Sequence, residues 1–141
     1  MRQAIILSVT IAATSLGLVV LADEKPPAAF QAAMKENGAT LQKMAKDVEA
    51  KDHAAIAADA AVLKRNFMGP VGSHFEGAKN ADALKMCTDA FSASDALEKA
   101  AKAMNDAEIA TARTSVQGAC AACHKAWRVQ LPDKTYEIKT N

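Results

Sequence analysis

Hydrophobic residues recur every three or four positions from residue 28 onward, which is the period of one face of an α-helix. The first such stripe consists of Phe30, Met34, Leu41, Met44 and Val48. Pro26 and Pro27 precede it, where a helix tolerates proline because its first N–H groups have no partner within the helix. A second helix follows, with Asp52 as its N-cap. Its predicted buried face comprises Ile56, Ala60, Leu63 and Phe67.

The helical period resumes after an interruption at residues 68–73, "MGPVGS", whose glycines and proline indicate a break. We expect a third helix to begin between His74 and Asn80. Its stripe comprises Leu84, Cys87, Phe91, Ser94, Leu97, Ala101 and Met104. A fourth helix begins at "NDAE", where Asn105 can cap and Glu108 can bond back to it in a capping box. Its stripe comprises Ile109, Ala112, Val116, Cys120, Cys123 and Trp127, and Pro132 is expected to end the helix.

These patterns predict an all-α fold. No segment alternates polar and apolar residues over a sustained length, and the glycine turns of β-hairpins are missing. Helices joined by short links favour an antiparallel up-down-up-down four-helix bundle, closed by its apolar stripes. The polar end of the chain, residues 131–141, is predicted to be an extended surface tail of this single domain.

Residues 1–22 combine a basic start, a long uncharged apolar run and small residues before position 23. This composition is typical of a signal peptide, so we predict cleavage after Ala22, export to the periplasm and a mature domain of residues 23–141. The alternative is an uncleaved anchor, because the run approaches the length that spans a bilayer. The whole chain has 17 basic and 16 acidic residues, and loss of Arg2 balances them. Nothing in the charge therefore favours nucleic acid as a partner.

The fourth predicted helix contains "CAACH", residues 120–124. Cys120 and Cys123 are three residues apart and share a helix face, while His124 is four residues from Cys120 and lies beside it. Two thiols at this spacing can form thioethers with the vinyl groups of one haem, and the adjacent imidazole can then bind the iron. Cys-x-x-Cys-His is the signature of c-type haem attachment, so the motif predicts one covalent haem c with His124 as an iron ligand.

Three other interpretations of the two cysteines exist. A thioredoxin-like pair would lie at a helix N-terminus after a strand, whereas this pair lies late in a helix. A structural zinc site needs four ligands, which Cys87 and a histidine would have to complete. A disulfide between Cys120 and Cys123 would be strained within a regular helix. Cys87 itself is expected to be a small buried hydrophobe, with a disulfide between two subunits as the alternative.

An exported helical chain of this size with "CAACHKAWR" on its last helix resembles the class II cytochromes c, that is, the cytochromes c prime and their low-spin relatives. The resemblance implies a four-helix bundle with the haem near the C-terminal helix, bound covalently by Cys120 and Cys123. It also implies that His124 is the proximal ligand and that Arg128 lies near this imidazole, where its charge would tune the iron. Arg128 could equally be a solvated cation at the helix end. Trp127 is expected to pack against the haem or the core.

The other face of the iron is where the members of this family differ. The resemblance of "FQAAMKENG" to their first helix places Met34 there, as a ligand in low-spin members and as a blocking group in five-coordinate ones. Methionine can serve either role, because its thioether is both a soft ligand and a flexible hydrophobe. His74, near a predicted loop, is the other candidate ligand. Phe30 stands where the family often has a basic residue that pairs with a haem propionate, so Gln31 or Lys35 would have to substitute.

The chain is therefore expected to be a periplasmic mono-haem electron carrier that is not an enzyme and that meets redox partner proteins. The haem and its iron would have His124 and Met34 as axial ligands, which suits electron transfer. The first alternative is a five-coordinate protein of the cytochrome c prime type that binds nitric oxide or carbon monoxide. The second is a haem-free helical module that uses its cysteines for metal or thiol chemistry. The resemblance also implies a homodimer in some members.

Overall fold

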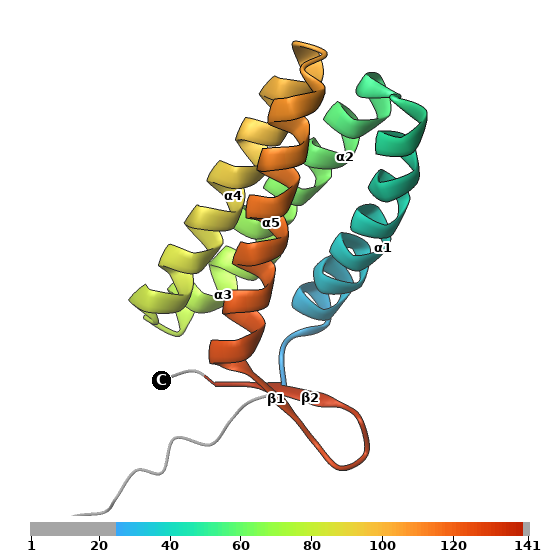
Figure 1. Ribbon diagram of the computed structural model, residues 1–141. Coiled ribbons are helices and arrows are strands. Elements are labelled where there is room, and N and C mark those ends of the chain that lie inside the picture. Colours follow the sequence, from blue (N-terminus) through green and yellow to red (C-terminus); the bar gives the residue numbers. More distant parts are fainter. Residues whose placement is uncertain (1–24, 140–141) are drawn as a thin grey trace, which may run out of the picture.

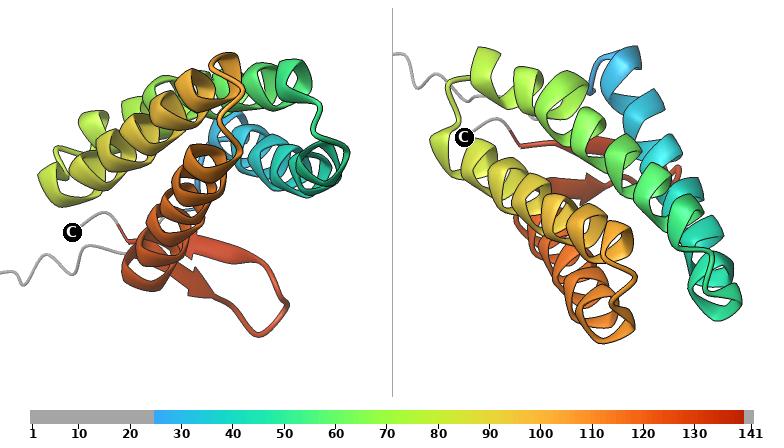
Figure 2. Two further views of the ribbon diagram at one scale, coloured as in Figure 1. Left: turned by 45° about the horizontal axis from the view of Figure 1, so that its top comes forward. Right: turned by 90° about the horizontal axis from the view of Figure 1, so that it is seen from above.

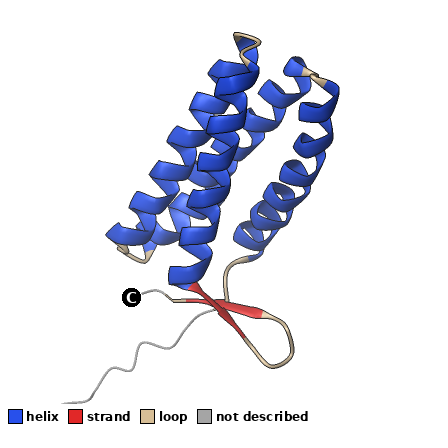
Figure 3. Ribbon diagram, viewed as in Figure 1, coloured by secondary structure: helices blue, strands red, loops and turns tan. Residues whose placement is uncertain are grey.

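The computed structural model describes residues 25–139, which are mostly helical (Figures 1 and 3). The long helices are α1 (Ala28–Ala50), α2 (His53–Asn66), α4 (Ala81–Lys102) and α5 (Asp106–Trp127). This confirms the expectation of four long helices and is compatible with an all-α bundle. The predicted signal peptide and its cleavage after Ala22 lie outside the described residues. Within residues 25–139, no helix is both long and apolar enough to cross a bilayer.

The helix starts follow the predicted capping residues. The carboxylate of Asp52 accepts a hydrogen bond from Ala55 N at 3.0 Å, and α1 begins directly after Pro27. Asn105 caps α5 by accepting from Glu108 N at 3.2 Å. The backbone N–H of Asn105 donates to the carbonyl of Ala100, so only one half of the expected capping box forms.

The break at residues 68–73 is a kink and not a loop. α2 runs into a π-helical turn, η1 (Phe67–Val71), and then into the short helix α3 (Gly72–Gly77). Gly69 has φ −84° and ψ −114°, which is not helical, and the next residue, Pro70, has no N–H to donate. The chain therefore changes direction here between consecutive helical segments, without an intervening loop. His74, expected near a loop, lies within α3.

The C-terminal segment forms a β-hairpin that the sequence pattern did not predict. α5 ends at Trp127, five positions before Pro132, because Arg128 is already extended, with φ −94° and ψ 125°. β1 (Arg128–Gln130) pairs antiparallel with β2 (Tyr136–Ile138), and Arg128 lies opposite Ile138. Ile138 is only 7% exposed and packs into a core cluster, which explains why this segment is not a free surface tail.

The core is divided into two clusters. The larger one lies between the long helices and includes Met44, Leu63, Leu97 and Val116, all fully buried. The smaller one lies toward the hairpin end of the molecule; its buried members are Phe30, Ala33, Val71, Phe75, Ala83, Cys87 and Ile138. One predicted core residue was wrong: Met104 is 70% exposed, because the chain leaves α4 at Lys102 and turns with φ 55° at Met104.

The long helices are not packed equally against one another. α4 packs against both α2 and α5, and α2 packs against α1, as both views in Figure 2 show. Within residues 25–139, α1 and α5 scarcely approach each other, although the hairpin lies at the end where α1 begins and α5 ends (Figure 1). The cavities of the molecule that are described below lie on the side between α1 and α5.

Candidate functional site

Two cavities lie between α1 and α5. The larger has a volume of about 480 Å³ and the smaller about 100 Å³. Met34 of α1 and Cys123 and His124 of α5 line both of them, so the two cavities meet at these side chains. The larger volume falls within the roughly 300–1,000 Å³ typical of pockets for small molecules and cofactors.

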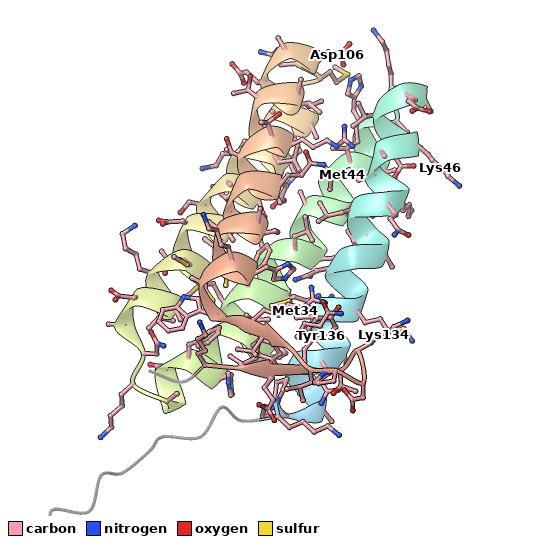
Figure 4. The ribbon with its side chains drawn as sticks, turned by 60° about the horizontal axis from the view of Figure 1, so that its bottom comes forward. Met34, Met44, Lys46, Asp106, Lys134 and Tyr136 are labelled. Carbon is pink, nitrogen blue, oxygen red and sulfur yellow. The ribbon has the colours of Figure 1, made fainter. Side chains whose placement is uncertain are left out.

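The structure brings the two cysteines of the motif, His124, Met34 and Arg128 to this pair of cavities. Cys120 lines the smaller cavity, Arg128 lines the larger one, and Cys123, His124 and Met34 line both. Met34 comes from the opposite helix, on the part of α1 near the hairpin and Tyr136, whereas Met44 lies much farther along the helix (Figure 4). The fold therefore brings Met34 and the Cys-x-x-Cys-His motif, which are far apart in the sequence, to the same cavities.

The two cysteines of the motif are free, partly buried thiols in the last third of α5. Burial raises the pKa of Cys123 to about 11 and also raises the pKa of Cys120. A thioredoxin-like pair has the opposite property, a lowered pKa at a helix N-terminus. Within residues 25–139, His, Cys, Asp and Glu side chains form no group of three or more that could hold a metal ion.

The third cysteine, Cys87, differs from the two motif cysteines in being fully enclosed in the core. Cys87 is 2% exposed and belongs to the smaller core cluster, where burial raises its pKa to about 12. This confirms the expectation of a small buried hydrophobe. A thiol so enclosed is not placed to form a disulfide with a second subunit.

His124 is exposed and lines both cavities. Although the ring retains contact with solvent, loss of part of its hydration lowers its pKa, and the nearby charge of Arg128 lowers it further. Both effects favour the neutral imidazole, which is the form that binds a metal ion.

Arg128 was expected on the same helix as His124. In the structure it is instead the first residue of β1. Its guanidinium carbon lies 3.2 Å from the centre of the Tyr136 ring, which is a cation–π contact across the hairpin. The hairpin therefore holds this charge at the larger cavity, close enough to influence His124.

The lining of the larger cavity is apolar with a positively charged rim. Lys25, Lys35 and Arg128 line it, and no Asp or Glu side chain does so among the described residues. Gln31, one of the predicted substitutes for the missing basic residue, donates to the carbonyl of Pro26 at 2.7 Å and is thus engaged. Lys35 is the substitute that the structure leaves at the rim. Such a lining suits an amphiphile with a large apolar body and carboxylate ends.

Two polar groups on the cavity walls carry donors without protein acceptors. The indole Nε1 of Trp127, at the larger cavity, and the amide Nδ2 of Asn37, at the smaller one, are buried and have no hydrogen-bond partner within residues 25–139. His74, in contrast, lines neither cavity; its ring packs 5.1 Å from that of Phe30 and 5.2 Å from that of Phe75.

Sequence reasoning missed part of the cavity wall. Phe75 of α3 and Tyr136 and Ile138 of the hairpin line the larger cavity. The only available signal for the hairpin was the short alternation Tyr136–Glu137–Ile138, too brief to distinguish a strand from a tail. Asn37 was missed because an isolated polar residue in a helix is normally taken as exposed.

Comparison of the chain with family models, with curated proteins and with solved structures found no match.

Proposed function

We propose that this chain is a periplasmic mono-haem cytochrome of the class II type, an electron carrier with one covalent haem c between α1 and α5. Cys120 and Cys123 would form the thioethers, and His124 and Met34 would be the axial ligands. The helices would run up-down-up-down, with the haem against the C-terminal helix. The protein would catalyse no reaction and would exchange electrons with redox partner proteins.

One observation carries this proposal. Cys123, His124 and Met34, predicted from two distant parts of the sequence, line the same two cavities, and Cys120 lines one of them. The chain's residues also fit the group: an apolar interior suits a porphyrin, and Lys25, Lys35 and Arg128 at the rim suit its propionates. Trp127 also lines the larger cavity, and its buried N–H has no acceptor within residues 25–139.

Haem c bound at this site would supply a ferric–ferrous couple for one-electron transfer. The residues of the chain define its environment. His124 and Met34 would hold the iron from opposite helices, a ligand pair that raises the potential. Arg128, held on Tyr136 by the hairpin, adds a fixed positive charge near the proximal ligand, and such a charge disfavours the oxidised, more positive iron.

A second candidate function is favoured by the smaller cavity. Met34 is only partly buried, and the smaller cavity of about 100 Å³ adjoins it. If Met34 faces the iron without binding it, this space could admit a small ligand such as nitric oxide or carbon monoxide. The protein would then belong to the five-coordinate type.

The test is expression with an apparatus that attaches haem c, followed by intact mass and by optical and EPR spectra of the oxidised protein. We expect the mass to increase by one haem that acid-acetone does not extract, and the spectra to show low-spin iron with a sulfur-to-iron charge-transfer band. Protein without covalent haem would refute both haem functions. High-spin iron would refute ligation by Met34 and leave the gas-binding candidate.

A matched pair of variants tests Met34 directly. Met34→Ala should convert the iron from low spin to high spin, because the sixth ligand is removed. Met44→Ala makes the same chemical change farther along α1, roughly 15 Å away by helical rise, and should leave the spectrum unchanged. Because Met44 is fully buried, its loss should lower the free energy of unfolding by about 2–5 kcal/mol. A Met34→Ala protein that stays low spin would show that another residue binds the iron.

A further inference from the structure

Asn37 is a buried polar side chain in the wall of the smaller cavity. It lies one helical turn after Met34 on α1 and is 4% exposed. Met34 and His124 line the same cavity, and the Nδ2 group of Asn37 has no hydrogen-bond partner within residues 25–139. Since buried amide groups in proteins are nearly always hydrogen-bonded, this donor requires an explanation.

The orientation of the Asn37 amide follows from its neighbours on α2. Asn66 Nδ2 donates to Glu36 Oε2 at 2.8 Å and to Asn37 Oδ1 at 2.9 Å. Glu36 Oε2 also accepts from the guanidinium of Arg65 at 3.0 Å, so this paired carboxylate is the acceptor in its contact with Asn66. Asn66 must therefore present its NH₂ group, and Asn37 must turn its oxygen toward Asn66. The NH₂ group of Asn37 is thereby turned away from Asn66 Nδ2.

We propose that Asn37 is a hydrogen-bond donor to ligands of the iron on the face of Met34. This inference rests on the proposed haem site, and it assigns a polar recognition group to an otherwise apolar wall. The smaller cavity would then favour small anions and polar diatomic molecules, whose outer atom accepts a hydrogen bond. Carbon monoxide, a weak acceptor, would gain little.

The chemistry of this step is a ligand exchange. In the wild type the incoming ligand would displace the Met34 thioether from the iron, and in Met34→Ala it would take the position left free. It would donate one electron pair to the iron, and its outer atom would accept one hydrogen bond from Asn37 Nδ2. The oxidation state of the iron does not change. A donor fixed in advance by Asn66 and Glu36 needs no rearrangement when the ligand enters. Hydrogen bonds to a charged acceptor contribute more than neutral ones, so an anionic ligand should depend most on Asn37.

The experiment uses the haem-loaded protein with Met34→Ala, which frees the sixth position, and compares it with the same protein carrying Asn37→Leu. Cyanide is the probe for the oxidised protein and carbon monoxide for the reduced one. We expect Asn37→Leu to weaken cyanide binding by roughly tenfold or more, and carbon monoxide binding much less. The infrared stretching frequency of bound carbon monoxide should rise, because the donor near its oxygen is lost. Thr40→Val, a buried change one turn along α1 outside both cavities, is the control and should alter neither value.

If Asn37→Leu does not fold, Asn37→Ala removes the same donor with a smaller side chain and is measured in its place. Unchanged cyanide affinity and carbon monoxide frequency, in a variant with intact covalent haem, would overturn the role of Asn37 and leave the cytochrome proposal standing. Equal weakening by Thr40→Val would also overturn it. A protein that lacks covalent haem in every variant would overturn both proposals.

Discussion

Replacing Gly72 by alanine should destabilise the wall of the smaller cavity. A Cβ at this position would lie 2.7 Å from the carbonyl oxygen of Phe67, because the π-helical turn η1 brings that oxygen against the start of α3. Ordinary contacts begin near 3.4 Å, so one of the two backbone segments would have to move by about 0.7 Å. Phe67 lines the smaller cavity, and the movement would therefore reach the candidate site.

The magnitude follows from two opposing terms. Overpacking costs typically about 1–3 kcal/mol, and we take the upper value because the obstacle is backbone and not a flexible side chain. Alanine offsets about 1 kcal/mol of this through its higher helix propensity. Gly72→Ala should thus lower the free energy of unfolding by about 2 kcal/mol, which corresponds to a decrease in Tm of roughly 8 °C for a domain of this size.

Thermal unfolding of the haem-loaded protein, followed by circular dichroism, measures this difference. Gly77→Ala is the matched control, since it lies on the same short helix and its added Cβ would meet nothing within 4 Å. The control should be neutral or stabilising by up to about 1 kcal/mol. Equal Tm values for the two variants would refute the close approach of η1 to α3.

Two further predictions concern a surface carboxylate and the third cysteine. Hydrogen bonds from Lys64 and Lys99 lower the pKa of Asp95 from 3.8 to about 2, so this group stabilises the folded state above about pH 4 and ceases to do so as the pH falls toward 2. The difference in Tm between wild type and Asp95→Asn should therefore be largest near neutral pH and should shrink as the pH falls through about 2, as circular dichroism would measure. Cys87 is buried with a pKa of about 12, so iodoacetamide near neutral pH should modify it only after unfolding, as intact mass would show.

Each of these predictions has a clear contrary outcome. A Tm difference for Asp95→Asn that does not shrink as the pH falls through about 2 would mean that the ion pairs are not its cause. Asp89→Asn, which removes a more exposed pair with Lys85, should change Tm little at any pH. Rapid labelling of native Cys87, or a disulfide-linked dimer on a non-reducing gel, would show that this thiol is accessible.

The helices were predictable because their signals are local. The apolar spacing along each segment and the capping residues Asp52 and Asn105 act within one or two turns, and the structure confirms them. The hairpin was not predictable because its stability comes from a distant contact. Ile138 is buried in the cluster that contains Phe30 and Phe75, and three residues of alternating pattern do not reveal that burial. The prediction that Met104 is buried was wrong because its spacing continues the apolar stripe although the chain has already turned away from the core.

The local sequence also determined the chemistry of the candidate site. Cys120, Cys123 and His124 are close on any regular helix, so their common face needed no knowledge of the fold. Met34 entered only through the resemblance of its surroundings to a known family, and Arg128 was expected on the wrong element. The structure places both at the larger cavity, Arg128 through the strand that follows α5.

Only the tertiary structure decided what lies opposite the motif and how much room there is. The distance between α1 and α5 depends on how α2 and α4 pack between these helices. It cannot be derived from the spacing of apolar residues along the chain. The same holds for Asn37, whose free donor exists because Asn66, from another helix, engages its oxygen. Helical periodicity and motif spacing are properties of neighbours along the chain. Cavities and the orientation of a buried amide arise from groups that meet only after folding.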